Sequence, residues 1–122
     1  MKSLVIITAI LAVMSVNADD RVRIDFYSEA LWPYCIRAYK NQVAKAIEAD
    51  GFLEMCDLQA IPYGNAKERR TNKGWEFDCQ HGEDECIGNM VETCAWNLIT
   101  DQLDKLKFLT CLETAVSQVP KA

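Results

Sequence analysis

Positive charge is scarce in this chain, which has 13 lysines and arginines against 18 aspartates and glutamates and a net charge of −5 at pH 7. Nucleic acids and anionic membranes bind basic surfaces, so this balance argues against both as partners. The sequence also has no Asn-x-Ser/Thr sequon, no internal repeat and no low-complexity tract. We therefore predict a protein that binds no nucleic acid and no membrane.

Long apolar runs are equally scarce, and the one that exists lies at the start of the chain. It covers residues 4–16 and follows Lys2, and Asn17 and the small Ala18 then precede two aspartates. The run is too short for a typical transmembrane helix, and its flanks are those of a secretory signal peptide. We predict a cleaved signal peptide at residues 1–18 and one small domain at 19–122, with an uncleaved anchor as the alternative.

Cysteines are plentiful by contrast, and all six follow the predicted signal peptide. In a chain bound for an oxidising compartment such cysteines are expected to form disulfides, and fifteen full pairings are open. A metal site is the alternative, but the candidate ligands match no common zinc spacing, so we predict no metal and no cofactor. His81 is interpreted as a polar loop residue, and Cys56 as a small buried apolar residue. The candidate ligands are Cys79, His81, Cys86 and Cys94.

The first half of the predicted domain has a strand–helix–strand pattern. Residues 22–27 alternate and are rich in β-branched and aromatic side chains, which predicts a strand. Pro33 suits the first position of a helix, whose apolar face recurs every three to four residues up to Gly51. Apolar residues 52–61 predict a second strand. A right-handed parallel βαβ unit follows from this order.

The second half is predicted to be mostly helical. Residues 66–78 are charged and irregular and are interpreted as a solvated loop. Residues 79–86 form a turn-rich segment closed by two cysteines, for which Cys79 with Cys86 is the first candidate for a local disulfide. Two apolar stripes of helical period then predict two helices with a break near Thr100. The stripes are Ile87, Met90, Val91, Cys94 and Leu98, and then Leu103, Leu106, Leu109, Leu112 and Val116.

Cys35 lies in the predicted first helical turn, among unpaired backbone N–H groups that favour a thiolate. Redox sites of this kind normally use two cysteines in a Cys-x-x-Cys motif, in which the second releases the mixed disulfide formed by the first. The first of these positions is Trp32 here. An indole cannot attack a disulfide, so the sequence has the surroundings of a redox site without its nucleophile.

Three segments of the chain together resemble the gamma-interferon-inducible lysosomal thiol reductase (GILT) family. Residues 27–35 read YSEALxPxC, residues 61–66 read IPYGNA, and residues 79–94 read CQHGxxxCxxNxxExC; FLTCLE at 108–113 is also similar. The resemblance implies an α/β, thioredoxin-like βαβ unit with a helical, cysteine-rich insertion. It also implies reduction of disulfide-containing proteins in acidic lysosomes, a secreted or lysosomal location, and a role in antigen processing or innate immunity.

In the family that this chain resembles, the catalytic Cys-x-x-Cys occupies the positions of Trp32 and Cys35. Cys35 then corresponds to the resolving cysteine, and Trp32 replaces the attacking one, so we predict a reductase that is weak or inactive. An unusual dithiol of Cys35 with Cys56 is an alternative that keeps activity. The predicted disulfide candidates, on which stability should depend, are Cys79, Cys86, Cys94 and Cys111.

A thioredoxin-like fold continues with a ββα half that carries a cis-proline, and we predict that this C-terminal half is missing from the chain. One edge of the sheet would then be open and available to a second copy or another partner. A non-catalytic binding protein is the main alternative function, in which Trp32, Tyr34 and the 79–86 segment contact a protein or microbial surface. A truncated isoform is a further alternative.

Overall fold

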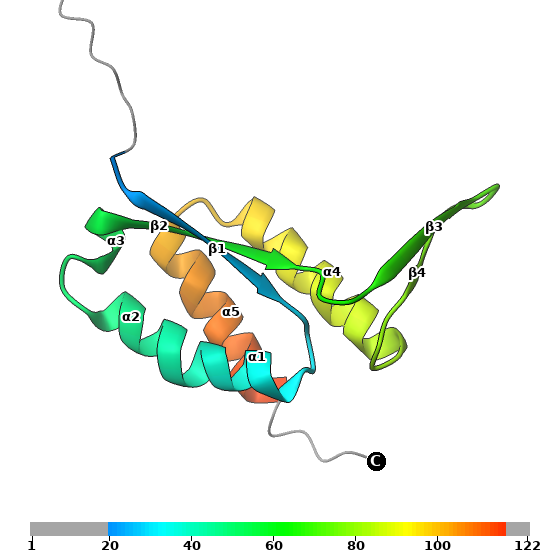
Figure 1. Cartoon of the computed structure of the whole chain (residues 1–122), viewed down its shortest axis with the longest axis horizontal. Helices are drawn as coiled ribbons and strands as arrows, with labels where there is room; N and C mark the ends of the chain where they lie inside the picture. Colours follow the sequence, from blue (N-terminus) through cyan, green and yellow to red (C-terminus); the bar gives the residue numbers. More distant parts are fainter. Residues whose placement is uncertain (1–19, 117–122) are drawn as a thin grey trace, which may run out of the picture.

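Two parallel strands, β1 (Val22–Ser28) and β2 (Cys56–Pro62), form the sheet on which the helices pack in the computed structural model (Figure 1). The structure describes residues 20–116, so the predicted signal peptide lies outside the described residues. The register pairs Val22 with Cys56 and Ser28 with Pro62. Both strands therefore end at the same level, which brings the segments that follow them side by side. The predicted βαβ unit and the α/β class are confirmed.

The helix that links the two strands has a π-helical middle. Its parts are α1 (Pro33–Ala38), η1 (Tyr39–Val43) and α2 (Ala44–Glu48), and Pro33 takes the first helical position as predicted. Trp32 is the N-cap residue and makes no capping hydrogen bond with its side chain. The apolar face packs inward, and its buried residues join the core formed by Tyr39, Val43, Leu58, Ala60, Leu106 and Leu109.

The second strand is shorter than predicted, because residues 52–55 form a helical turn, α3 (Phe52–Met55). Gly51 reverses the chain with a φ of +79°, and Phe52 then packs against the core. The pairing of β1 begins at Val22, opposite Cys56, so residues 52–55 have no partner there. The prediction of a strand over 52–61 is correct for its second part alone.

Residues 66–78 are a β-hairpin and not the predicted loop. Strands β3 (Lys67–Thr71) and β4 (Gly74–Asp78) pair in antiparallel fashion and project away from the helices (Figure 1). A two-residue turn joins them, with the Thr71 hydroxyl donating to the carbonyl of Gly74 at 3.0 Å. The charged side chains are exposed, so the expectation of a solvated segment is confirmed and the expectation of irregular backbone is wrong.

The two predicted C-terminal helices are present as α4 (Glu83–Leu98) and α5 (Gln102–Val116), with the break at the predicted place. Their apolar stripes behave differently. Leu106 and Leu109 of α5 are buried, whereas Met90 and Leu98 of α4 are 59% and 82% exposed. The buried residues of α4 are polar: Glu85, Asn89 and Glu92. No helix within residues 20–116 has both the length and the apolar character needed to cross a membrane.

Candidate functional site

The segment between β1 and α1 is the point at which the three similar sequence segments meet. Glu29 and Ala30 are 2% and 3% exposed, although they lie in a connection and not in a helix or strand. Leu31 has a φ of +67°, a left-handed conformation that costs roughly 1–2 kcal/mol for a residue other than glycine. Such a conformation persists only where neighbouring groups hold it in place.

Glu29 is held by the segment that follows β2. Its Oε2 accepts hydrogen bonds from the backbone N and the Nδ2 of Asn65, both at 3.0 Å. Gly64, with a φ of +59°, lies so close that a Cβ at this position would overlap the Glu29 side chain. The second similar segment therefore requires its glycine because the glutamate packs against the backbone there.

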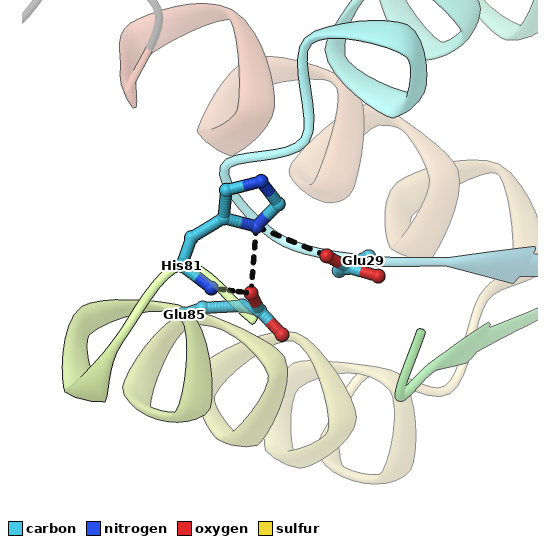
Figure 2. A group of neighbouring side chains, drawn as sticks. All are labelled: Glu29, His81 and Glu85. Atoms are coloured by element: carbon cyan, nitrogen blue, oxygen red, sulfur yellow. Dashed lines mark hydrogen bonds and ion pairs between the residues drawn. The ribbon is translucent and has the colours of Figure 1, made fainter. Parts of the chain in front are cut away.

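His81 connects Glu29 to the start of α4, as Figure 2 shows. The imidazole Nδ1 lies 3.0 Å from Glu29 Oε1 and 2.7 Å from Glu85 Oε2, and the backbone N of His81 donates to the same Glu85 oxygen at 2.6 Å. Glu85 is fully buried, whereas the His81 side chain is 33% exposed. His81 is thus a polar residue of a turn, as interpreted from the sequence, and it is also the central member of a polar cluster that the sequence did not reveal.

A disulfide joins Cys79 to Cys86 across the turn that contains His81, which confirms the predicted local bridge. Because both sulfurs are in this bond, the alternative metal site of Cys79, His81, Cys86 and Cys94 is contradicted. Cys94 has a free, exposed thiol, as does Cys111. Of the four cysteines predicted to form disulfides, Cys79 and Cys86 are bonded to each other, and the other two are free.

Cys35 is half-buried in the first turn of α1, and it lines an open cavity of about 520 Å³. Trp32 and Tyr34 also line this cavity, so the structure brings together the three residues predicted at the redox position. The indole of Trp32 lies edge-on to His81, with 5.7 Å between the ring centroids. Tyr34 is 69% exposed, and the Arg37 guanidinium lies 4.4 Å from the centre of its ring.

The environment of Cys35 favours the thiol. Burial is the largest cause that raises the pKa of Cys35, and the charges of Glu113, Glu29 and Glu92 raise it further. A hydrogen bond with the backbone of Glu29 acts in the opposite direction. The expectation that the helix start favours a thiolate here is not met, since burial and nearby carboxyls outweigh it.

Cys56 lies at the opposite end of the sheet from Cys35. It begins β2 opposite Val22, whereas Cys35 follows the other end of β1. A seven-residue strand is roughly 20 Å long, at about 3.3 Å per residue. A dithiol of Cys35 with Cys56 is therefore contradicted, because a disulfide requires the two Cα atoms to be within about 7 Å.

A second carboxyl pair is buried between α4 and α5. Glu92 and Glu113 are each 1% exposed, and within residues 20–116 neither Glu92 oxygen receives a hydrogen bond from a donor group. Burial, with the neighbouring Glu113, raises the pKa of Glu92 to about 9, and burial also raises the pKa of Glu113. The pair therefore holds at least one proton at neutral pH.

Sequence reasoning did not identify Glu29, Asn65, Glu85, Asn89 or the Glu92–Glu113 pair as site residues. Most of them are named letters of the similar segments quoted above. Their membership of these segments is the sequence feature that could have identified them as site residues.

Comparison with known proteins gives a consistent result. A family model described as gamma interferon inducible lysosomal thiol reductase (GILT) matches residues 23–122. The gamma-interferon-inducible lysosomal thiol reductase of Carassius auratus is 38% identical over 81 residues, which are 66% of this chain and 31% of that protein. The mouse protein of the same name is 48% identical over 64 residues, covering 50% of this chain and 24% of its own length.

A GILT-like protein of Drosophila melanogaster is 37% identical over 93 residues, or 76% of this chain and 43% of that protein. The matched part is therefore less than half the length of each of these three relatives.

Proposed function

Because the chain belongs to the gamma-interferon-inducible lysosomal thiol reductase family, we propose that it is a thiol–disulfide oxidoreductase homologue with weak or absent reductase activity. The single observation that carries this proposal is the identity of residue 32. Trp32 is the N-cap residue, three positions before Cys35, where the resemblance places the attacking cysteine. An indole cannot form the mixed disulfide that begins thiol exchange.

The state of the remaining thiol supports the same proposal. Thiolate is the attacking species in exchange, and the raised pKa of Cys35 keeps it protonated at acidic and neutral pH. If Cys35 attacked a substrate disulfide, the adduct would be a mixed disulfide and one substrate thiolate would leave. A second thiol would then have to release Cys35, and Cys56 is too distant to act.

We further propose that the βαβ unit is the beginning of a thioredoxin-like fold and that the protein acts in a secreted or lysosomal setting. The parallel pairing of β1 with β2, and the position of Cys35 in the first turn of α1, support the fold. The Cys79–Cys86 disulfide supports an oxidising compartment. The protonated Glu92–Glu113 pair supports an acidic one, since such a pair destabilises the fold when it loses protons.

A non-catalytic binding function is the second candidate, and the exposed aromatic ring beside the Cys35 cavity favours it. Tyr34 and Trp32 are neighbours, with 6.5 Å between their ring centroids, and both face the same opening. Aromatic rings of this kind are frequent anchors in protein interfaces. The proposed partner is a disulfide-containing protein or a microbial surface protein.

Association through the sheet edge is also proposed. Within the described residues, β1 pairs with β2 alone, and Val22, Ile24 and Tyr27 of β1 are exposed. An open edge of this kind is a site where another strand can add. Sedimentation of the chain and of an Ile24→Lys variant tests this, and a wild-type chain that stays monomeric at high concentration contradicts it.

Insulin reduction at acidic and neutral pH tests the main proposal. We expect wild-type turnover near that of the Cys35→Ser variant, with Cys111→Ser as the matched control for loss of a free thiol. Robust wild-type turnover that is lost in Cys35→Ser alone contradicts the proposal. For the binding function, Trp32→Ala and Tyr34→Ala should weaken capture of a partner, and unchanged capture removes these rings from the interface.

A further inference from the structure

Two buried carboxylates and one imidazole nitrogen converge on a single point (Figure 2), and the ring of Trp32 packs against that imidazole. Glu29 comes from the end of β1, His81 from the disulfide-closed turn, and Glu85 from the first turn of α4. One possible ligand atom from each of the three lies within 4.8 Å of the other two. Within residues 20–116 no other group of three such side chains meets this criterion.

The charges and hydrogen bonds inside this cluster do not balance. The imidazole Nδ1 carries at most one hydrogen, and two carboxylates lie within 3.0 Å of it. Among residues 20–116, no group donates a hydrogen bond to the buried Glu85 Oε1 or to Glu29 Oε1, although Glu29 Oε1 lies 3.0 Å from Nδ1. Buried carboxylate oxygens are costly unless a cation or a donor satisfies them. The two carboxylates therefore carry more negative charge than a single imidazole can balance.

We propose that Glu29, His81 and Glu85 bind a divalent metal ion of the Zn²⁺ class. One imidazole nitrogen and two carboxylate oxygens are a normal donor set for Zn²⁺, with water at the fourth position. Bonds of about 2.0–2.1 Å in a tetrahedral site place donor atoms about 3.3 Å apart. The observed separations of 2.7 and 3.0 Å need to widen by about 0.6 and 0.3 Å when Nδ1 binds the ion without its hydrogen.

The neighbours of the cluster hold its ligands in position. Asn65 binds Glu29 Oε2 twice, which leaves Oε1 directed at His81. The backbone N of His81 donates to Glu85 Oε2, the oxygen that lies 2.7 Å from Nδ1, and so holds that oxygen beside the imidazole. Hydrogen bonds that orient ligating carboxylates in this way are typical of metal sites. The Cys79–Cys86 disulfide closes the turn that presents His81.

This site goes beyond the proposed function, and it adjoins Cys35, because Glu29 also lines the cavity beside that thiol. A bound ion would tie the β1–α1 segment to α4 and fix the ring of His81, against which Trp32 packs at 5.7 Å. The metal would thus stabilise the loop that carries Trp32. The proposed site contains no cysteine. The four free thiols, which could also bind the ion, can therefore be blocked without loss of the site.

Calorimetric titration with ZnCl₂ tests the site after the free thiols have been alkylated. We expect one ion per chain. Glu85→Gln and His81→Ala should weaken binding by more than about 100-fold, and Asn65→Ala, which acts through Glu29, by about 10- to 100-fold. Glu83→Gln is the matched control, because Glu83 lies in the same helical turn and is exposed, and it should bind like the wild type.

Absence of binding in the alkylated chain overturns the proposal, as does equal binding by Glu85→Gln and His81→Ala. Circular dichroism and the intact Cys79–Cys86 bond identify variants that fold. A second measurement does not depend on the variants: Co²⁺ should give visible absorption bands without a sulfur-to-metal charge-transfer band in the unalkylated chain. A strong charge-transfer band that alkylation removes together with all binding assigns the ion to cysteines and contradicts the site.

Discussion

Asn89 of α4 accepts a hydrogen bond at its Oδ1 from the backbone N of Ala30, with a distance of 2.9 Å. Its Nδ2 donates to the carbonyl of Tyr63 at 3.4 Å, so one side chain joins both segments that follow the sheet. Asn89 is 7% exposed, and a Cβ added to the neighbouring Gly88 would lie 2.6 Å from that of Ala30. Close helix packing and this amide together hold the left-handed turn at Leu31.

Replacement of Asn89 by alanine should therefore destabilise the fold. The buried N–H of Ala30 would lose its partner, and an unsatisfied buried donor costs about 1–3 kcal/mol. Chemical denaturation should show this loss in the free energy of unfolding. Asn97→Ala is the matched control, since the exposed Asn97 of the same helix bonds the carbonyl of Thr93. Equal stability of the Asn89 and Asn97 variants would show that the amide does not hold the loop.

The pH dependence of stability should come largely from Glu92 and Glu113. Their raised pKa values mean that the folded chain keeps a proton which the unfolded chain loses above the ordinary glutamate pKa of about 4.3. The stabilisation is complete below that value and is lost as pH rises through the folded pKa, which is about 9 for Glu92. The free energy of unfolding should thus fall with rising pH by up to about 1.4 kcal/mol per unit.

Denaturation midpoints at several pH values between these limits measure the slope. Glu92→Gln keeps the volume and removes the titrating group, so the slope should become shallower. Glu83→Gln, an exposed change in the same helix, should leave the slope unchanged. A wild-type stability that rises from acidic to alkaline pH would contradict the shared proton.

The four free thiols should react with an alkylating reagent in two groups. Cys94 and Cys111 are exposed and should react first, whereas Cys35 and Cys56 are half-buried and should react later. The raised pKa of Cys35 slows it further, because the thiolate is the reactive form. Peptide mass spectrometry after short exposure measures the order. Modification of Cys35 before Cys94 would mean that the redox position is more open and more acidic than the structure indicates.

The sequence was sufficient for the elements whose pattern has a single physical solution. The structure has a strand where residues 22–27 alternate and a helix that begins at Pro33. It also has a helix, α5, where the second apolar stripe predicted one. The turn closed by Cys79 and Cys86 was equally direct, because short spacing favours a local bridge.

The face of α4 could not be predicted from its own periodicity. Its apolar stripe predicted a helix, but the side turned inward carries Glu85, Asn89 and Glu92. Tertiary partners decide this orientation: Glu85 meets His81, Asn89 meets Ala30, and Glu92 meets Glu113. These partners lie outside α4, in the preceding turn, in the β1–α1 segment and in α5. The hydrophobicity of α4 alone therefore predicts that its apolar face is buried, which is the opposite of what the structure has.

Loss of the Cys79–Cys86 disulfide should weaken both the fold and the proposed metal site. A bond that closes a loop of this size contributes roughly 2–3 kcal/mol by restricting the unfolded chain. Cys86 directly follows Glu85, and the turn that the bond closes carries His81, so a Cys79→Ser/Cys86→Ser chain should lose Zn²⁺ affinity as well as stability. Cys94→Ser, an exposed change in the same helix, is the control. A double variant that unfolds at the wild-type midpoint and binds Zn²⁺ equally well would show that hydrogen bonds from His81 to Glu85 hold the turn without the disulfide.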